Sequence, residues 1–196
     1  SSGDLVSKNG TVRINETVGD QTIPFSIQYN VSVNPNLIDM TGWTVKDTLP
    51  EVSDSDKQQH YVGAVKVTAY DRENGNVSGE TTVPVERDSY SWEYTIPKEL
   101  GRCFLQFTYY TDIQEPSGSN ASNEILLTAP EGSGYPRNQA WIYQHRMYIQ
   151  HLYADENNNR MAGWEAGDHW LEGSSDPVCK RTDKFGGCGH SSRWGL

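Results

Sequence analysis

Apolar and polar residues alternate along much of the first 130 residues, in short runs separated by turn-forming residues. The clearest run spans residues 23–33, where every second residue from Ile23 to Val33 is apolar or aromatic and the residues between are mainly polar. A period of two places alternate side chains on opposite faces, so this run predicts a half-buried β-strand. Apart from a single turn near residues 97–100, no segment of the first 130 residues favours a helix.

Further runs with strand character cover residues 11–14, 42–47, 61–70, 81–85, 90–96, 103–111 and 122–128. Asn74-Gly75, between two of these runs, is typical of a hairpin turn, and Asn34-Pro35-Asn36 closes the run at 23–33. Short strands at this regular spacing predict an all-β protein with a β-sandwich over residues 1–130.

The rest of the chain, residues 131–196, differs in composition from the predicted sandwich. It follows a linker-like stretch rich in Pro, Gly and Ser and contains two of the 3 cysteines. The chain has 16 Lys and Arg against 26 Asp and Glu, a net charge of −10, and the whole acidic excess lies before residue 134. We therefore predict a separate aromatic-rich, irregular extension or small second domain over 131–196.

Charge and motifs exclude several classes of function. Nucleic-acid binders need clustered Lys and Arg, which this acidic chain lacks. No apolar run approaches the roughly 18–20 residues that cross a bilayer, and the first residues resemble a mature start rather than a signal peptide. The sequence contains no phosphate-binding glycine loop, no GxSxG elbow and no HExxH motif, so we expect no enzyme that turns over a substrate.

Fragments of the predicted sandwich carry a family resemblance. In chain order they are residues 6–11 (VSKNGT), 37–50 (LIDMTGWTVKDTLP), 107–112 (FTYYTD) and 122–127 (SNEILL). Together they resemble the collagen-adhesin A-type Ig-like modules of Gram-positive surface adhesins and pili, and their relatives in repetitive surface proteins. The resemblance covers residues 5–129 and implies an Ig-like β-sandwich in an extracellular, cell-surface protein.

Many members of that family form an intramolecular isopeptide bond. The resemblance implies that Lys8 supplies the amine, Asn123 the carboxamide, and Asp47 the catalytic acid. Asn123 is followed by Glu-Ile rather than by the commoner small residue, so Asn120 stays open as an alternative acceptor. A structural alternative also stays open, with an exposed Lys8, an Asp47 that caps a turn and an Asn123 at a strand edge.

The crosslink has definite chemical requirements. An ammonium has no lone pair, so burial must lower the pKa of Lys8 to give a neutral amine. A protonated Asp47 carboxyl is expected to polarise the carboxamide oxygen and to pass a proton to the departing ammonia. The bond forms once per molecule and needs no cofactor. It would close a loop of about 115 residues, an entropic constraint of about 4–5 kcal/mol.

Residues 141–153 (WIYQHRMYIQHLY) are aromatic-rich and show no clean period of two or 3.6. The favoured interpretation is a buried packing stripe, and the alternative is a platform on which sugars stack. His145 and His151 are core or surface histidines, with a metal pair as the less favoured option.

One loop has the spacing of oxygen ligands in calcium sites. Asp155, Asn157, Asn159, Met161 and Glu165 occupy its candidate ligand positions, which makes calcium a candidate cofactor. An arginine stands where such loops have glycine, so a plain polar loop is the alternative.

Two cysteines near the end of the chain are candidates for a disulfide. Cys179 and Cys188 flank a short hydrophilic loop and predict a local disulfide in an exported chain. Zinc bound by these two cysteines with His169 and His190 is the less favoured alternative. Cys103 lies in a strand-like run and is predicted to be a buried thiol.

Asn-x-Ser/Thr triplets are frequent. If the host has the machinery, they mark glycosylation sites at Asn9, Asn15, Asn30, Asn76 and Asn120. A β-protein rich in Thr and Ser also accumulates such triplets by chance.

The sequence thus predicts an extracellular structural or adhesive module of a surface protein or filament. Its partners would be a host or matrix protein, a glycan, or neighbouring copies, with no nucleic acid and no membrane span. One alternative is a carbohydrate- or protein-binding module without a crosslink, and another is a filament subunit whose C-terminal region packs on a neighbour. A third is an enzyme accessory domain or a hydrolase that uses acidic and histidine residues of 131–196, such as Asp168.

Overall fold

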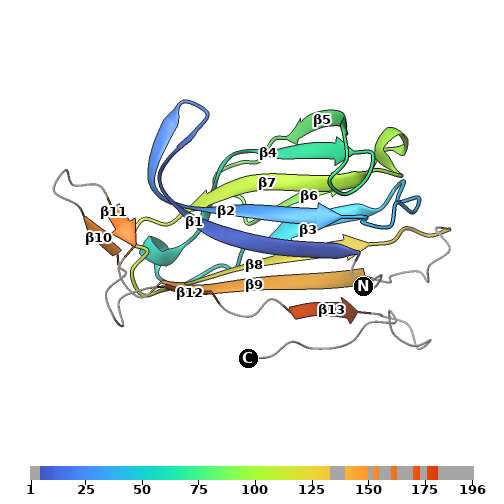
Figure 1. Cartoon of the computed structure of the whole chain (residues 1–196). Helices are drawn as coiled ribbons and strands as arrows, with labels where there is room; N and C mark the ends of the chain where they lie inside the picture. Colours follow the sequence, from blue (N-terminus) through green and yellow to red (C-terminus); the bar gives the residue numbers. More distant parts are fainter. Residues whose placement is uncertain are drawn as a thin grey trace.

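The computed structural model describes the backbone of residues 5–132, 140–149, 152–154, 160–162, 170–172 and 176–180, and the side chains of 5–132 and 141–149. Within these residues the chain is almost entirely β-structure, with two short 3-10 helices, η1 (Ser55–Lys57) and η2 (Lys98–Leu100). The strands form two antiparallel sheets that enclose the core (Figure 1). The predicted all-β, Ig-like sandwich is confirmed.

The first sheet has the order β1-β2-β7-β4-β5, so β1 and β5 are its edges. Its strands are β1 (Val6–Val18), β2 (Gln21–Val33), β7 (Phe104–Asp112), β4 (His60–Tyr70) and β5 (Val77–Val83). β1 and β2 form a long hairpin paired from Val6↔Val33 to Val18↔Gln21. Its closed end rises away from the rest of the sandwich (Figure 1).

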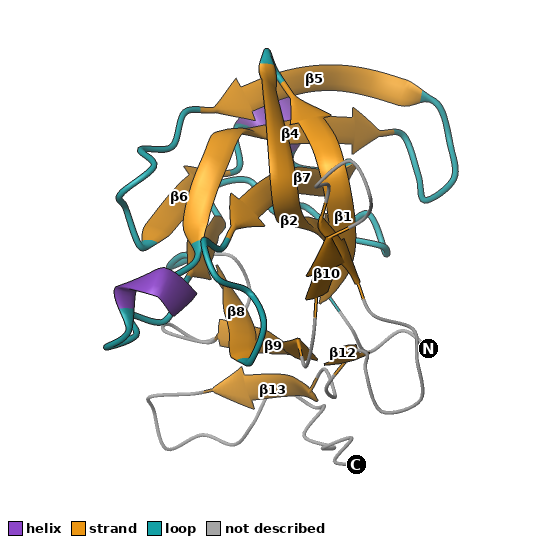
Figure 2. Ribbon diagram, turned by 90° about the vertical axis from the view of Figure 1, so that its left-hand side faces the viewer, coloured by secondary structure: helices purple, strands orange, loops and turns teal. Residues whose placement is uncertain are grey.

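The second sheet has the order β12-β9-β8-β3-β6, and β13 also pairs with β9. Figure 2 shows β8 and β9 beneath the strands of the first sheet. The strands are β12 (Trp170–Glu172), β9 (Ala140–Ile149), β8 (Ser119–Thr128), β3 (Thr44–Thr48), β6 (Ser91–Thr95) and β13 (Asp176–Lys180). A separate pair joins β10 (Leu152–Ala154) to β11 (Arg160–Ala162).

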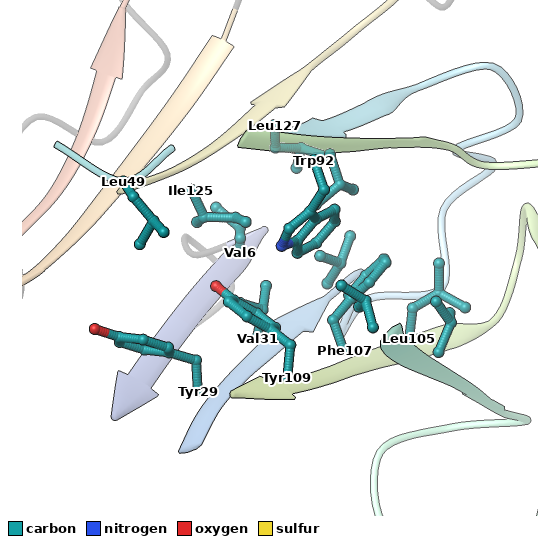
Figure 3. Close-up of a cluster of buried hydrophobic side chains, with 14 of the residues drawn as sticks. Val6, Tyr29, Val31, Leu49, Trp92, Leu105, Phe107, Tyr109, Ile125 and Leu127 are labelled. Atoms are coloured by element: carbon teal, nitrogen blue, oxygen red, sulfur yellow. The ribbon is translucent and has the colours of Figure 1, made fainter. Parts of the chain in front are cut away.

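The alternating pattern of β2 is realised in the core. Its residues 23, 25, 27, 29, 31 and 33 are all buried, and those from 25 to 33 belong to the core cluster. From the facing sheet, Trp92 of β6 stacks on Phe107 of β7 with ring centroids 5.6 Å apart, and meets Tyr109 edge to face at 5.2 Å. Figure 3 shows this aromatic cluster beside Val31, Ile125 and Leu127. Such burial of large apolar side chains is the main stabilising contribution to the fold.

The predicted turns lie where the sequence placed them. Asn74 adopts a positive φ of 61° in the β4–β5 hairpin, a conformation that asparagine tolerates better than most residues. Asn34 also has a positive φ, of 69°, and is buried at the end of β2. Its carboxamide accepts a hydrogen bond from the Ile38 amide and donates to the Ile38 carbonyl, which fixes the turn.

The sandwich extends beyond the predicted boundary at residue 130. β9 pairs with β8 along its whole length, from Ser119↔Ile149 to Thr128↔Ala140. Trp141 of β9 stacks on Trp43 at 5.4 Å, and Met147 and Ile149 are buried. Residues 141–149 of the aromatic-rich stretch are therefore part of a strand of the second sheet that packs on the core, as the packing interpretation predicted. The sandwich thus includes β9, and any irregular extension can begin only after Ile149.

Candidate functional site

Lys8, Asp47 and Asn123 meet between the two sheets. Lys8 comes from β1, the edge of the first sheet, while Asp47 and Asn123 come from neighbouring strands β3 and β8 of the second. Lys8 Nζ donates to Asp47 Oδ1 at 2.9 Å, and Asn123 Nδ2 donates to Asp47 Oδ2 at 2.8 Å. One carboxylate therefore holds the amine on one oxygen and the carboxamide on the other.

All three side chains are withdrawn from solvent. Those of Lys8 and Asp47 are 0% exposed, and residue Asn123 as a whole is 1% exposed. Lys8 follows the inward row of β1, together with the buried Val6 and Gly10. The structural alternative, an exposed lysine beside a turn-capping aspartate and a strand-edge asparagine, does not describe these positions.

Burial changes the proton affinity of the amine. It lowers the pKa of Lys8 from 10.5 to about 8, although the charge of Asp47 and the hydrogen bond to it act in the opposite direction. The lowered pKa raises the share of neutral amine at pH 7 far above that of a solvated lysine. The site thus supplies the nucleophilic form of the amine under ordinary conditions.

Two tyrosine hydroxyls complete the site, and the sequence analysis missed both. Tyr109 of β7 accepts a hydrogen bond from Lys8 Nζ at 2.5 Å, and its hydroxyl lies 2.9 Å from Asn123 Oδ1 as a donor. It also hydrogen-bonds Asp47 Oδ1. Tyr61 of β4 donates to Asp47 Oδ2 at 2.6 Å. Tyr109 therefore contacts every member of the Lys–Asp–Asn group.

An aromatic and polar wall closes the site on the side of the first sheet. Lys8 Nζ lies 4.6 Å from the ring centroid of Tyr29, which stacks on Tyr109 at 5.4 Å. Figure 3 shows both tyrosine hydroxyls pointing in the same direction. The Tyr29 hydroxyl donates to Gln59 Oε1 at 2.6 Å, and Thr111 donates to the same oxygen at 2.8 Å. This wall excludes water from the amine.

The structure distinguishes the two candidate acceptors. Asn123 faces the interior, whereas Asn120, three residues earlier on β8, is exposed on the opposite face. A separation of three residues reverses the side-chain direction in a strand. Only Asn123 lies beside Lys8 and Asp47.

Asp47 faces a different atom from the one that the sequence analysis expected. We predicted that it would polarise the carboxamide oxygen of Asn123, but its Oδ2 accepts a hydrogen bond from the carboxamide nitrogen. The oxygen lies instead toward the hydroxyl of Tyr109. The orientation of the carboxamide is thus set by a donor on one side and an acceptor on the other.

His145 of β9 lies next to the site. It pairs with Asn123 across β8 and β9, is buried, and meets Tyr29 edge to face at 6.0 Å. His145 is therefore a core histidine, one of the two positions that the sequence left open for it. A Cβ on Gly10 of β1 would lie 3.0 Å from His145 Cε1 and 3.1 Å from Tyr29 Cε1. Gly10 therefore lets β1 approach β9 closely beside Lys8.

We expect Gly10→Ala to destabilise the fold by about 1–3 kcal/mol, because its methyl group would push β1 away from the His145 and Tyr29 rings. Chemical denaturation measures the loss. Gly79→Ala on β5 is the matched control, since its nearest neighbour is Leu100 Cδ2 at 3.9 Å, an ordinary contact. Equal stability of the two variants would contradict the close approach at Gly10.

Most other predicted sites lie outside the described side chains. This holds for the calcium candidates Asp155, Asn157, Asn159, Met161 and Glu165, for the Cys179–Cys188 disulfide, for the zinc alternative, and for His151 and Asp168. Among the residues with described side chains, no group of three or more His, Cys, Asp or Glu is placed to hold a metal ion. These site predictions remain predictions.

The sequons and Cys103 lie mostly near the surface. Asn9, Asn15, Asn76 and Asn120 are exposed, while Asn30 is half-buried and accepts a hydrogen bond from Thr108 at 3.0 Å. Cys103 is a free thiol that is only half-buried, against the prediction of full burial, because it lies just before β7 begins. In the described part of the chain, no helix is long and apolar enough to span a membrane.

Of the comparisons with known proteins, the one with solved structures gives matches. No family model matches the sequence, and no curated protein matches it. A collagen-binding domain from a Staphylococcus aureus adhesin is similar with a TM-score of 0.48 and 11% identity, over 74% of this chain and 98% of that domain. The collagen-binding domain of the Erysipelothrix rhusiopathiae surface protein RspB has a TM-score of 0.42 and 14% identity, over 93% of this chain and 52% of that protein chain.

Pilin subunits are also among the similar structures. BcpA, the major pilin subunit of Bacillus cereus, has a TM-score of 0.39 and 12% identity, over 88% of this chain and 55% of that one. Adhesin domains and pilins are the classes that the sequence resemblance indicated. At identities this low the similarity concerns the fold, and the chemistry must be derived from the side chains of this chain.

Proposed function

We propose that this chain is a structural module of a surface adhesin or filament that crosslinks itself once, through an isopeptide bond between Lys8 and Asn123. The observation that carries the proposal is the hydrogen-bonded group in which Asp47 holds both reacting side chains in a solvent-free interior. Folding brings the two groups together, so the reaction gains the rate advantage of an intramolecular step.

The charges of the site suit this reaction. Lys8 donates to Asp47 Oδ1, and transfer of that proton leaves a neutral amine beside a neutral acid. The pair avoids the cost of keeping two ions buried, which is high even for a well-formed ion pair. Asp47 then holds a proton within reach of the Asn123 nitrogen, where a leaving group must be protonated.

We infer that the departing ammonia leaves beside residue Asn123. A cavity of about 280 Å³ borders this residue and is lined by residues of β3, β8, β9 and the segment after β3. Among its lining residues are Pro50, Glu124, Gln144 and Arg146. Ammonia that leaves through this cavity makes the crosslink irreversible, because the reverse reaction lacks its nucleophile.

The product would suit a protein that works outside the cell. An amide resists the reductants that break disulfides, and it joins the edge strand of one sheet to an inner strand of the other. We place the module in an extracellular surface protein, with a matrix protein, a glycan or a neighbouring copy as its partner. The sequence resemblance to surface-adhesin modules supports this setting.

Intact-protein mass spectrometry tests the proposal. The folded chain is expected to weigh one ammonia less than its sequence, and a proteolytic digest should contain a branched peptide that joins Lys8 to Asn123. Asn123→Ala should restore the full mass, whereas Asn120→Ala, the matched control on the exposed face of the same strand, should still lose ammonia. A wild-type chain of full sequence mass would overturn the proposal.

A further inference from the structure

We propose that the hydroxyl of Tyr109 is the catalytic donor that stabilises the oxyanion when Lys8 attacks Asn123, while Asp47 works on the two nitrogens. The inference rests on the proposed crosslink. It assigns to Tyr109 the stabilisation of the carboxamide oxygen and leaves to Asp47 the transfer of protons, two roles that Asp47 would otherwise fill alone. It concerns a residue for which the sequence indicated no role.

The positions of the polar atoms support this division. The Asn123 oxygen, where negative charge develops during attack, lies 2.9 Å from the Tyr109 hydroxyl. The two oxygens of Asp47 lie 2.9 Å from the attacking nitrogen of Lys8 and 2.8 Å from the leaving nitrogen of Asn123. A donor aimed at the developing charge is the arrangement that stabilises tetrahedral intermediates in acyl transfer.

Tyr109 has one proton to donate and two acceptors in reach, Asp47 Oδ1 and Asn123 Oδ1. While Asp47 is ionised, its carboxylate is the stronger acceptor and competes for that proton. Once Asp47 takes the proton of Lys8, its Oδ1 no longer needs a donor, and the Tyr109 hydroxyl is released to Asn123 Oδ1. The proton transfer that creates the nucleophile therefore also switches on the oxyanion donor.

Tyr109 keeps its proton at all ordinary pH values. Burial, and next the negative charge of Asp47, raise its pKa well above 10. The phenol is therefore a permanent donor, in surroundings of low dielectric where a hydrogen bond to a developing charge is strongest. Its ring is fixed by Tyr29 on one side and by Trp92 at 5.2 Å on another, so the donor is positioned before the reaction begins.

The step balances without any co-reactant. Neutral Lys8 Nζ attacks Asn123 Cγ, a new C–N bond forms, and the carbonyl electron pair moves onto Oδ1 beside Tyr109. The proton that Asp47 took from Lys8 is delivered to Nδ2, and the resulting carboxylate then takes the surplus proton from Nζ through Oδ1. The Cγ–Nδ2 bond then breaks, its electron pair leaves with ammonia, and the carbonyl re-forms as a secondary amide.

A refolding experiment measures the rate. The experiment starts from full-length chain, recovered from inclusion bodies in denaturant, whose intact mass still equals the sequence mass, so that no crosslink has formed. After dilution into buffer, tryptophan fluorescence reports folding and quenched samples report ammonia loss by mass. We expect Tyr109→Phe to fold and to lose ammonia about 100–1000-fold more slowly than wild type, as when one oxyanion donor is removed from an enzyme.

Tyr29→Phe and Tyr61→Phe are the matched controls. Each removes one buried hydroxyl near the site, but Tyr29 donates to Gln59 and Tyr61 to Asp47, and neither donates to the Asn123 oxygen. Both are expected to crosslink much faster than Tyr109→Phe. A Tyr109→Phe rate within about threefold of wild type would overturn the inference and leave the crosslink standing, whereas a wild type that never loses ammonia would overturn the crosslink itself.

A second variant keeps the test decisive if Tyr109→Phe does not fold. In a Tyr29→Phe/Tyr61→Phe background, biosynthetic replacement of tyrosine by 3-fluorotyrosine makes Tyr109 a more acidic donor at unchanged position. A faster loss of ammonia than in the unfluorinated double variant would support the oxyanion role. An equal or slower rate would contradict it.

Discussion

Replacing Lys8 with methionine is expected to abolish ammonia loss and to lower the melting temperature by roughly 10–20 °C relative to the crosslinked chain. The crosslink constrains the unfolded state by about 4–5 kcal/mol, and each kcal/mol corresponds to about 2–4 °C in a protein of this size. Methionine preserves most of the volume of the buried lysine stem. The measurements are intact mass and calorimetric melting of both proteins.

The control for Lys8→Met is Lys46→Met on β3, which removes an exposed lysine outside the site. It should lose ammonia and melt close to the wild type. If Lys8→Met melted at the wild-type temperature while the wild type carried the crosslink, the covalent bond would contribute no stability to this fold. If Lys8→Met still lost ammonia, Lys8 would not be the amine.

Asp47→Asn is expected to prevent crosslinking and to make stability rise with pH. The variant loses the proton acceptor of Lys8 and leaves the amine buried without a counter-charge. Asp47 acts to raise the pKa of Lys8, so its removal drives that pKa below the present value of about 8. The unfolded chain then binds a proton that the folded chain does not, over the range from below pH 8 to 10.5.

The sign of the effect follows from this difference. Below the pKa that Lys8 has in the folded variant, both the folded and the unfolded chain bind the proton, and the cost of burying an ammonium lowers the free energy of unfolding in full. As the pH rises toward 10.5 the unfolded state loses its advantage, so the free energy of unfolding increases by up to about 1.4 kcal/mol per pH unit. Across pH 8 to 10.5 the gain should be about 3 kcal/mol.

Denaturant titrations at several pH values measure that slope. Other lysines and tyrosines titrate in the same range, so the control is the double variant Lys8→Met/Asp47→Asn, which keeps all of them and lacks the buried amine. The difference between the two slopes isolates Lys8. Parallel slopes would mean that Lys8 is not held neutral in the folded state.

Much of the sandwich could be predicted because its strands have one buried face. β2 shows this best, since its inward residues are all apolar or aromatic and its turn ends on Asn34. β9 was not recognised as a strand of the sandwich. Its inward row includes the polar His145, while Ile142 and Tyr148 lie on the other face, so three exceptions within nine residues hide the period of two.

The candidate site could be predicted only in part. Lys8, Asp47 and Asn123 were assigned because the resemblance to surface-adhesin modules gives residues at these positions a role in a crosslink. Tyr61 and Tyr109 were not, because a tyrosine in a strand is an ordinary core residue. Which buried hydroxyls converge depends on how the two sheets are offset, and a single strand pattern carries no information on that offset.

The place of β9 beyond Asn123 has a mechanical consequence. In the crosslinked protein, a force applied between the two ends of the chain would pass through the new amide and bypass everything between Lys8 and Asn123. β9 lies outside the segment that the crosslink protects from the force, although it is hydrogen-bonded along the full length of β8. Under tension β9 would separate from β8 first, which dissipates energy and uncovers the cavity beside Asn123. The segment between Lys8 and Asn123 would keep its length.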